Sequence, residues 1–145
     1  MTLVDTSCFE ELRNQRLWSQ IYSNTKNTKI YDGISELVSE LVKYYKVGIV
    51  TSSPRTYAER IIDYYSLNIP VLSAYHDTKN HKPHPEPIIK GCQVLQLNAN
   101  EVFLFLIDGS SSKDKYDDLK KYGGFVEAVS TVKEIRNIVF SEIVG

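Results

Sequence analysis

Two carboxylates lie close together in the sequence, just after its most apolar segment. Residues 102–107 read VFLFLI, and Asp108 follows them directly, with Gly109, three serines and then Asp114. An apolar run without polar alternation is typical of a parallel β-strand buried on both faces, and the carboxyl ends of such strands form the ligand sites of open α/β sheets. Oxygen ligands of this kind suit a hard cation such as Mg²⁺. The stretch therefore predicts a metal site at Asp108 and Asp114, the alternative being a turn-capping Asp108 and a solvated Asp114 at a helix start.

Two earlier apolar segments are also followed by residues whose side chains could take part in a reaction. Residues 47–50 read VGIV and are followed by Thr51 and two serines. Residues 71–75 form the next expected strand, and the polar loop after it contains Lys82 in the sequence KPHPE. A hydroxyl, an ammonium group and a pair of acids thus follow three successive strands, and parallel strands bring such ends to one edge of a sheet.

The elements that must position these residues alternate between strand and helix from residue 47 onward. Strands are expected at 47–50, 71–75, 102–107 and 125–129, and helices at about 54–65, 85–95 and 113–122 and after residue 131. Alternation of this kind predicts right-handed crossovers and a parallel sheet with helices on both faces. Before it, residues 9–22 predict a first helix, and apolar spacing over residues 34–45 predicts the most clearly amphipathic one. The expected fold class is α/β, a three-layer sandwich around a parallel sheet.

Composition narrows the class of protein. The chain has 145 residues, 42% of them hydrophobic and 24% charged, with a formal net charge of −1. These values are typical of one globular domain, and they give no reason to expect a nucleic acid or an anionic membrane surface as a partner. No segment is long enough to span a bilayer, and the two cysteines match no metal-binding spacing, so we expect a cytoplasmic protein.

The three strand ends, taken in order, resemble the motifs of the haloacid dehalogenase superfamily of phosphatases and phosphotransferases. Its second motif is an apolar strand ending in Thr or Ser, as at Thr51, and its third is a lysine often found in K-P-x-P-E, as at Lys82. Its fourth is a strand ending in an acid with another acid shortly after, as at Asp108 and Asp114, although Ile107 replaces the usual glycine. The resemblance covers roughly residues 32–129 and implies a Rossmann-like core.

The resemblance also implies a function and a role for each residue. In this superfamily an aspartate attacks phosphorus and forms an aspartyl-phosphate. Thr51 would then bind a phosphoryl oxygen with help from Ser52, and Lys82 would neutralise charge on the nucleophile and the phosphoryl group. Asp108 would bind Mg²⁺, with Asp114 orienting it. The implied activity is that of a Mg²⁺-dependent phosphomonoester phosphatase whose partner is a small phosphorylated metabolite.

The N-terminus departs from the superfamily pattern. The first motif is a strand followed by D-x-D-G-T, whose first aspartate is the nucleophile, and no D-x-D occurs before Thr51. Residues 2–7, TLVDTS, resemble the sequence that normally follows this motif, which would place the start of the chain just after both acids. A second interpretation takes Asp5 as the nucleophile with Ser7 in place of the second acid. The simplest is that Asp5 and Ser7 cap the first helix.

This departure affects the expected sheet and the domain plan. The superfamily's first strand lies between the strands that end in Thr51 and Asp108, so a short or missing first strand would expose their edges. We expect either that residues 1–5 pair there or that another chain, as in a homo-oligomer, covers these edges. The expected plan is a single domain over 1–145, with a remnant of the superfamily's cap at 8–30 and the core at 31–145.

The cap remnant and the loop histidines allow further interpretations. Side chains at residues 13, 16, 18 and 22, two of them arginines, could face a substrate, although ordinary packing of a surface helix is the preferred interpretation. His76, Asp77, His81 and His84 share one loop and suggest a transition-metal site, but their spacing fits no standard zinc pattern, and solvated loop residues are the default. The sequence has no G-x-G-x-x-G or G-x-x-x-x-G-K motif, which argues against the dinucleotide-binding and P-loop classes. The second functional class that survives is a non-catalytic relative, or a fragment of one, that acts through association.

Overall fold

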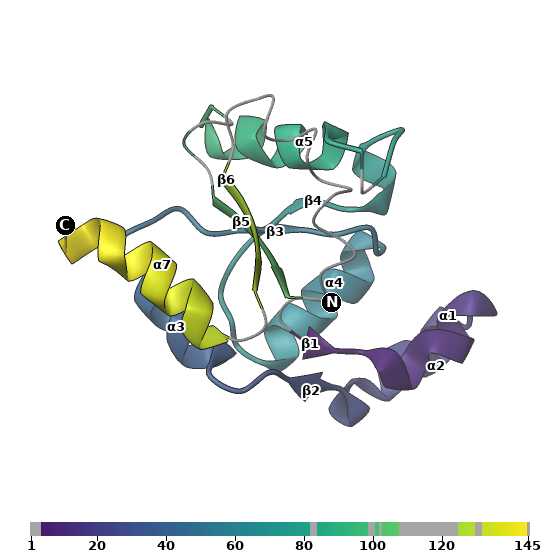
Figure 1. Ribbon diagram of the computed structural model, residues 1–145. Coiled ribbons are helices and arrows are strands. Elements are labelled where there is room, and N and C mark those ends of the chain that lie inside the picture. Colours follow the sequence, from purple (N-terminus) through teal and green to yellow (C-terminus); the bar gives the residue numbers. More distant parts are fainter. Residues whose placement is uncertain are drawn as a thin grey trace.

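The computed structural model describes residues 4–81, 84–98, 101, 103–107, 125–129 and 132–144 (Figure 1). Its elements, in chain order, are β1 (Val4–Asp5), the 3-10 helix η1 (Ser7–Phe9), α1 (Glu10–Asn14), α2 (Trp18–Ser23), the 3-10 helix η2 (Thr25–Asn27), β2 (Lys29–Ile30), α3 (Ile34–Leu41), β3 (Ile49–Val50), α4 (Arg55–Tyr64), β4 (Val71–Ser73), the 3-10 helix η3 (Tyr75–Asp77), α5 (Glu86–Leu95), β5 (Phe103–Ile107), β6 (Phe125–Val129) and α7 (Val132–Val144).

The described strands form three pairs. β3 and β4 are parallel and are joined through α4, which makes a β-α-β unit, and β5 and β6 are parallel over five residues each. β1 pairs with β2 in antiparallel fashion, with Val4 opposite Ile30 and Asp5 opposite Lys29. Parallel strands joined through a helix confirm the α/β class, whereas the three-layer sandwich around one continuous sheet stays a prediction. One of the two expectations placed residues 1–5 between the strands that end in Thr51 and Asp108, but Val4 and Asp5 pair with β2 in the described structure.

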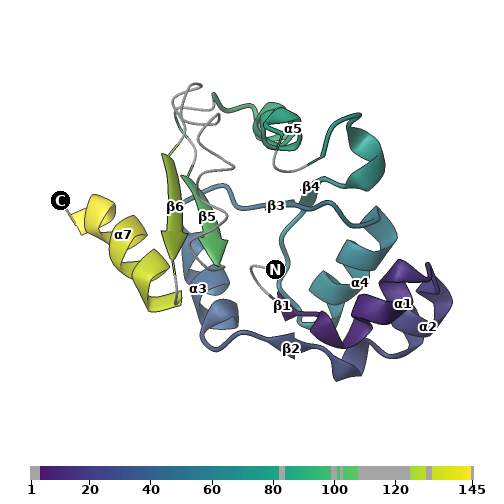
Figure 2. The ribbon, with the colours of Figure 1, turned by 45° about the vertical axis from the view of Figure 1, so that its right-hand side comes forward.

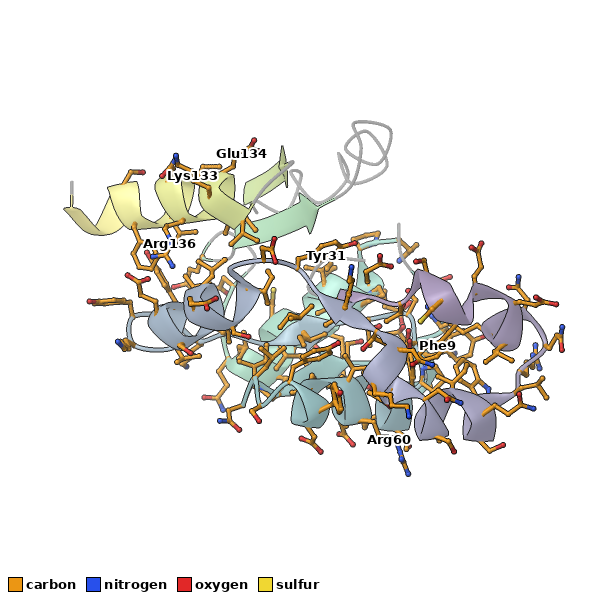
Figure 3. All side chains as sticks on the ribbon, turned by 90° about the horizontal axis from the view of Figure 1, so that it is seen from below. Phe9, Tyr31, Arg60, Lys133, Glu134 and Arg136 are labelled. Atoms are coloured by element: carbon orange, nitrogen blue, oxygen red, sulfur yellow. The ribbon has the colours of Figure 1, made fainter. Side chains whose placement is uncertain are left out.

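Helices cover these strand pairs from several sides. α5 lies against β3 and β4, and α7 lies beside α3 (Figures 1 and 2). α2 contacts α4, and α1 lies against α2. Figure 3 shows Arg136 on the side of α7 that faces α3, where its guanidinium forms an ion pair with Glu40, while Lys133 and Glu134 lie on the other side of α7. None of the helices in the described part of the chain is long and apolar enough to cross a membrane.

The expected single helix over residues 9–22 is wrong, because the chain breaks there into α1 and α2. Arg16 takes a left-handed conformation with φ of 57°. The Leu17 N–H then donates to the Leu12 carbonyl at 2.9 Å, and the Arg16 N–H donates to the Arg13 carbonyl at 3.0 Å. These two bonds define a Schellman ending, which satisfies the last carbonyls of a helix. α4 and α5 end in the same way, with Ser66 and Gln96 in the left-handed position.

Three clusters of buried side chains hold these elements together. The largest joins α3, α4 and β4 and includes Ile34, Val38, Ile62, Leu67, Ile69, Val71 and Ala74. A second joins β1, η1 and α2 to α4 through Val4, Phe9, Ile21, Tyr57 and Ile61. A third joins α3 to α7 through Leu37, Ile135 and Val139. α4, which follows the turn at Thr51, is therefore anchored by packing in two of these clusters.

Candidate functional site

Thr51 lies at the carboxyl end of β3, as the sequence predicts. Its N–H donates to the Ser73 carbonyl at 2.9 Å, which extends the β3–β4 pairing by one residue. Its Oγ1 accepts a hydrogen bond from the Ser53 N–H at 3.0 Å, so the hydroxyl shapes the turn that follows the strand. Thr51 is half-buried and Ser52 is exposed. The turn therefore holds one hydroxyl in place and presents the next to solvent.

The loop after β4 lies against this turn. The Tyr75 N–H donates to the Ser53 carbonyl at 3.0 Å. The polar residues that follow β3 and the start of the loop that carries Lys82 thus meet at one edge of the β3–β4 pair. Lys82 itself lies outside the described residues, and so do Asp108 and Asp114. The predicted meeting of the hydroxyl, the ammonium group and the acid pair stays a prediction.

An arginine that sequence reasoning missed fastens the start of the same loop. Arg55, at the start of α4, donates from Nη1 to the Val71 carbonyl at 2.7 Å and from Nη2 to Asp77 Oδ2 at 2.5 Å. Asp77 Oδ2 also accepts the Ala74 N–H at 2.8 Å. The Ala74 N–H and then the Arg55 side chain hold the pKa of Asp77 below its ordinary value. No local sequence pattern signals this contact, because Arg55 and Asp77 are 22 positions apart.

A glutamate fastens the other end of the loop. Glu86, in the first turn of α5, accepts the Lys79 N–H on Oε1 at 3.1 Å, and on Oε2 it accepts the Asn80 N–H at 3.0 Å and the Asn80 Nδ2 at 2.8 Å. The Asn80 side chain contributes most to a lowered pKa of Glu86, followed by the Lys79 N–H. Glu86 is the last residue of the KPHPE sequence, which was the available signal, although only its lysine was given a role.

Asp5 makes a local turn rather than the expected helix cap, since Thr6 and Phe9 are the N-caps of η1 and α1. Its Oδ1 accepts the Ser7 N–H at 2.9 Å at the start of η1. The Ser7 N–H, and then the Ser7 side chain, hold the pKa of Asp5 below its ordinary value. An ionised carboxylate is the form that a nucleophile requires, but this one is engaged in a local turn.

The histidine loop does not form a metal site in the described structure. The Tyr75 ring stacks on His81 with centroids 4.2 Å apart and packs edge-on against His76 at 5.0 Å. Asp77 is engaged by Arg55, and His84 Nδ1 accepts the Glu86 N–H at 3.1 Å. Among the residues that the structure describes, no group of three His, Cys, Asp or Glu side chains could hold a metal ion.

The aromatic residues of the cap remnant pack against α4. Trp18 and Tyr22 lie against Tyr57, with ring centroids 5.8 and 6.5 Å away, and the Arg60 guanidinium covers the Tyr22 ring at 4.6 Å. Arg13 Nη1 donates to Thr6 Oγ1 at 2.6 Å. These contacts favour ordinary packing over contact with a substrate.

The chain is similar in sequence to known proteins. Residues 4–114 match the family of haloacid dehalogenase-like hydrolases. The N-acetylmuramic acid 6-phosphate phosphatase of Pseudomonas putida is 33% identical over 103 residues, which cover 69% of this chain and 46% of that protein. The pyrophosphatase PpaX of Bacillus cereus is 36% identical over 77 residues, which cover 51% of this chain and 36% of that protein. The matched part thus spans less than half the length of either relative.

A solved structure shows the same fold. The crystal structure of a HAD-superfamily hydrolase from Ehrlichia chaffeensis superposes with a TM-score of 0.67 at 21% identity, covering 81% of this chain and 60% of that one. This similarity confirms a Rossmann-like α/β fold of the haloacid dehalogenase type.

Proposed function

The chain belongs to the family of haloacid dehalogenase-like hydrolases, and from this premise we propose that it handles a phosphoryl group as a phosphatase-like hydrolase acting on phosphomonoesters. The turn at the end of β3 carries the proposal. There the Thr51 side chain is held by the Ser53 N–H, Ser52 is exposed, and the Tyr75 N–H fastens the next loop to the same turn. Phosphatase relatives with 33–36% identity support the same chemistry.

In this proposal Thr51 and Ser52 bind phosphoryl oxygens and Lys82 neutralises charge that develops during transfer. A threonine that both accepts from a backbone N–H and ends a strand is oriented before any ligand arrives. Preorganised donors of this kind contribute to catalysis because they need not reorganise during the reaction. Lys82 enters the proposal through the K-P-x-P-E resemblance.

Mg²⁺ enters the proposal through Asp108 and Asp114, whose side chains are the oxygen ligands that a hard cation prefers. The acids of the described residues form no such site. When bound, the ion would offset the negative charge of the phosphoryl group. The steps assigned to Thr51, Ser52 and Lys82 do not depend on its position.

Asp5 is the nucleophile in this proposal. A carboxylate is the group that attacks phosphorus in this chemistry. The hydrogen bond that it accepts from the Ser7 N–H favours the second candidate, a non-catalytic member of the family that keeps the phosphate-binding corner or the scaffold and acts through association.

The remaining parts of the proposal concern the whole protein. We propose a small phosphorylated metabolite as substrate, a cytoplasmic location, and one domain in which residues 8–30 form the cap remnant and residues 31–145 a three-layer core. A homo-oligomer that covers exposed sheet edges completes the proposal.

The experiment is a phosphatase assay with p-nitrophenyl phosphate and Mg²⁺ on the unchanged chain and three variants. Asp5→Asn and Thr51→Val remove the proposed nucleophile and the phosphoryl-binding hydroxyl while they keep the shape of each side chain. Asp32→Asn, an exposed acid in a turn, is the matched control. We expect turnover that Asp5→Asn abolishes, Thr51→Val lowers by about 10²-fold and Asp32→Asn leaves unchanged. No turnover at any Mg²⁺ concentration would select the non-catalytic candidate.

A further inference from the structure

The carboxylate of Glu86 makes its hydrogen bonds to the preceding loop and not to the first turn of its own helix, α5. An acid in the first turn of a helix ordinarily interacts with the free N–H groups of that turn. Here both oxygens reach back to the loop, to groups six and seven positions earlier in the chain. The first turn of α5 is satisfied by other groups, since the Ile88 and Ile89 N–H donate to the Pro85 carbonyl and the Glu86 N–H donates to His84.

Three donors from two adjacent residues converge on this one carboxylate. Lys79 contributes its N–H, and Asn80 contributes its N–H and its side-chain amide. Hydrogen bonds to an ionised acceptor are about twice as strong as those between neutral groups. Two consecutive N–H groups on the two oxygens of one carboxylate fix the direction of the backbone, and Lys82 is only two residues beyond Asn80.

Asp77 plays the corresponding part at the other end of the loop, where it accepts the Ala74 N–H and Arg55. The segment from Ala74 to Asn80 is thus fastened by one carboxylate at its start and another at its end. The Asp77 contact ties the loop to α4, and the Glu86 contact ties it to α5. Because α5 packs on β3 and β4, the Glu86 contact sets the loop relative to the strand that ends in Thr51.

We propose that Glu86 is a positioning residue of the phosphate-binding corner: its carboxylate holds the backbone of Lys79 and Asn80, in the loop that the Tyr75 N–H fastens to the turn after Thr51. This inference rests on the proposed function. It predicts that charge matters more than size at this position. A glutamine has one acceptor oxygen, and its NH₂ group would face a backbone N–H that it cannot accept. The lowered pKa of Glu86 agrees with this dependence on charge.

The test uses the full chain, NMR-detected amide hydrogen exchange and titration with inorganic phosphate. Glu86→Gln removes the charge, Glu86→Asp keeps it on a shorter side chain, and Glu36→Gln is the matched control, because Glu36 is the first-turn acid of α3 and is exposed. Exchange at Lys79 and Asn80 reports the hydrogen bonds directly. The amide shift of Ser52 reports phosphate binding.

We expect Glu86→Gln to lower the protection of the Lys79 and Asn80 amides about tenfold and to weaken phosphate binding about five- to tenfold. Glu86→Asp should restore part of both, and Glu36→Gln should change neither. The amide of Ile61, in the α4 core, should stay protected in every variant, which separates a local effect from unfolding.

Two results would overturn the inference without touching the proposed function. One is unchanged protection of Lys79 and Asn80 in Glu86→Gln, and the other is lost protection with unchanged phosphate affinity. If the unchanged chain fails to bind phosphate, the proposed function and the positioning role fall together. The exchange data then still identify whether Glu86 holds the loop.

Discussion

Adding one methyl group at Gly48 should destabilise the strand that carries Thr51. A Cβ at this position would lie 2.5 Å from both Cγ and Cδ1 of Leu72 and 2.9 Å from its Cδ2. These distances are far inside the optimum of about 3.5–4.0 Å between carbon atoms. Leu72 is 6% exposed, and Cγ sits close to its backbone. The side chain therefore cannot relieve the contact by moving its far end alone.

The magnitude follows from two opposing effects. Overpacking a filled core costs about 1–3 kcal/mol. Gly48 does not have a left-handed φ, so alanine gains about 0.4–1 kcal/mol from the smaller entropy of its unfolded chain. The net loss in the free energy of unfolding should be about 0.5–2 kcal/mol, which lowers Tm by about 2–6 °C for a domain of this size.

A double-mutant cycle with Leu72→Ala, read by urea unfolding, identifies the cause. Leu72→Ala alone should cost about 2–5 kcal/mol. With the leucine shortened, Gly48→Ala should become neutral or stabilising, which gives a coupling of about 1–2 kcal/mol. Additive effects of the two substitutions, or a Gly48→Ala variant as stable as the unchanged chain, would refute the steric argument.

Four further outcomes can be checked by urea unfolding. A carboxyl whose pKa is lowered by folding stabilises the fold above its unfolded value, about pH 4, and loses this effect as the pH falls through the folded value. Asp77→Asn should therefore be less stable than the unchanged chain at pH 7, and the difference should shrink as the pH falls below about 4. Gln96→Gly should raise the free energy of unfolding by about 0.5–1 kcal/mol, because it relieves a left-handed residue at a helix end. Val139→Ala should cost about 2 kcal/mol from the α3–α7 cluster, where Val139 is 3% exposed. Arg136→Gln should cost about 0.2–1 kcal/mol through its partly exposed pair with Glu40, and 1 M salt should remove most of the difference.

The local sequence pattern was sufficient to predict elements whose structure is decided by the spacing of their apolar residues. β6 covers the expected residues 125–129, and α3 begins at Ile34, directly after Gly33, whose φ of 81° starts the helix. The break between α1 and α2 was missed because the apolar spacing over residues 9–22 continues across it. What breaks the helix is the left-handed Arg16, a position where glycine, the usual signal, is absent.

The candidate site, too, was predictable from the sequence only in part. The end of β3 at Thr51 follows from an apolar run that stops at a hydroxyl. The contacts that shape the neighbouring loop cannot be predicted from an apolar segment. Arg55 with Asp77, and Glu86 with Asn80, are polar pairs that only the folded loop brings together. Sequence reasoning gave Asp77 a role as a possible metal ligand, and in the structure its Oδ2 accepts hydrogen bonds from Arg55 and the Ala74 N–H.

The docking of the N-terminal helices on α4 has a practical consequence. Trp18 is the only tryptophan of the chain, and it lies against Tyr57 of α4. Its fluorescence therefore reports the contact between α2 and α4, whereas circular dichroism averages over all helices. If the emission changes at a lower urea concentration than the ellipticity does, residues 8–30 detach before the remainder melts, and the two segments behave as separate cooperative units.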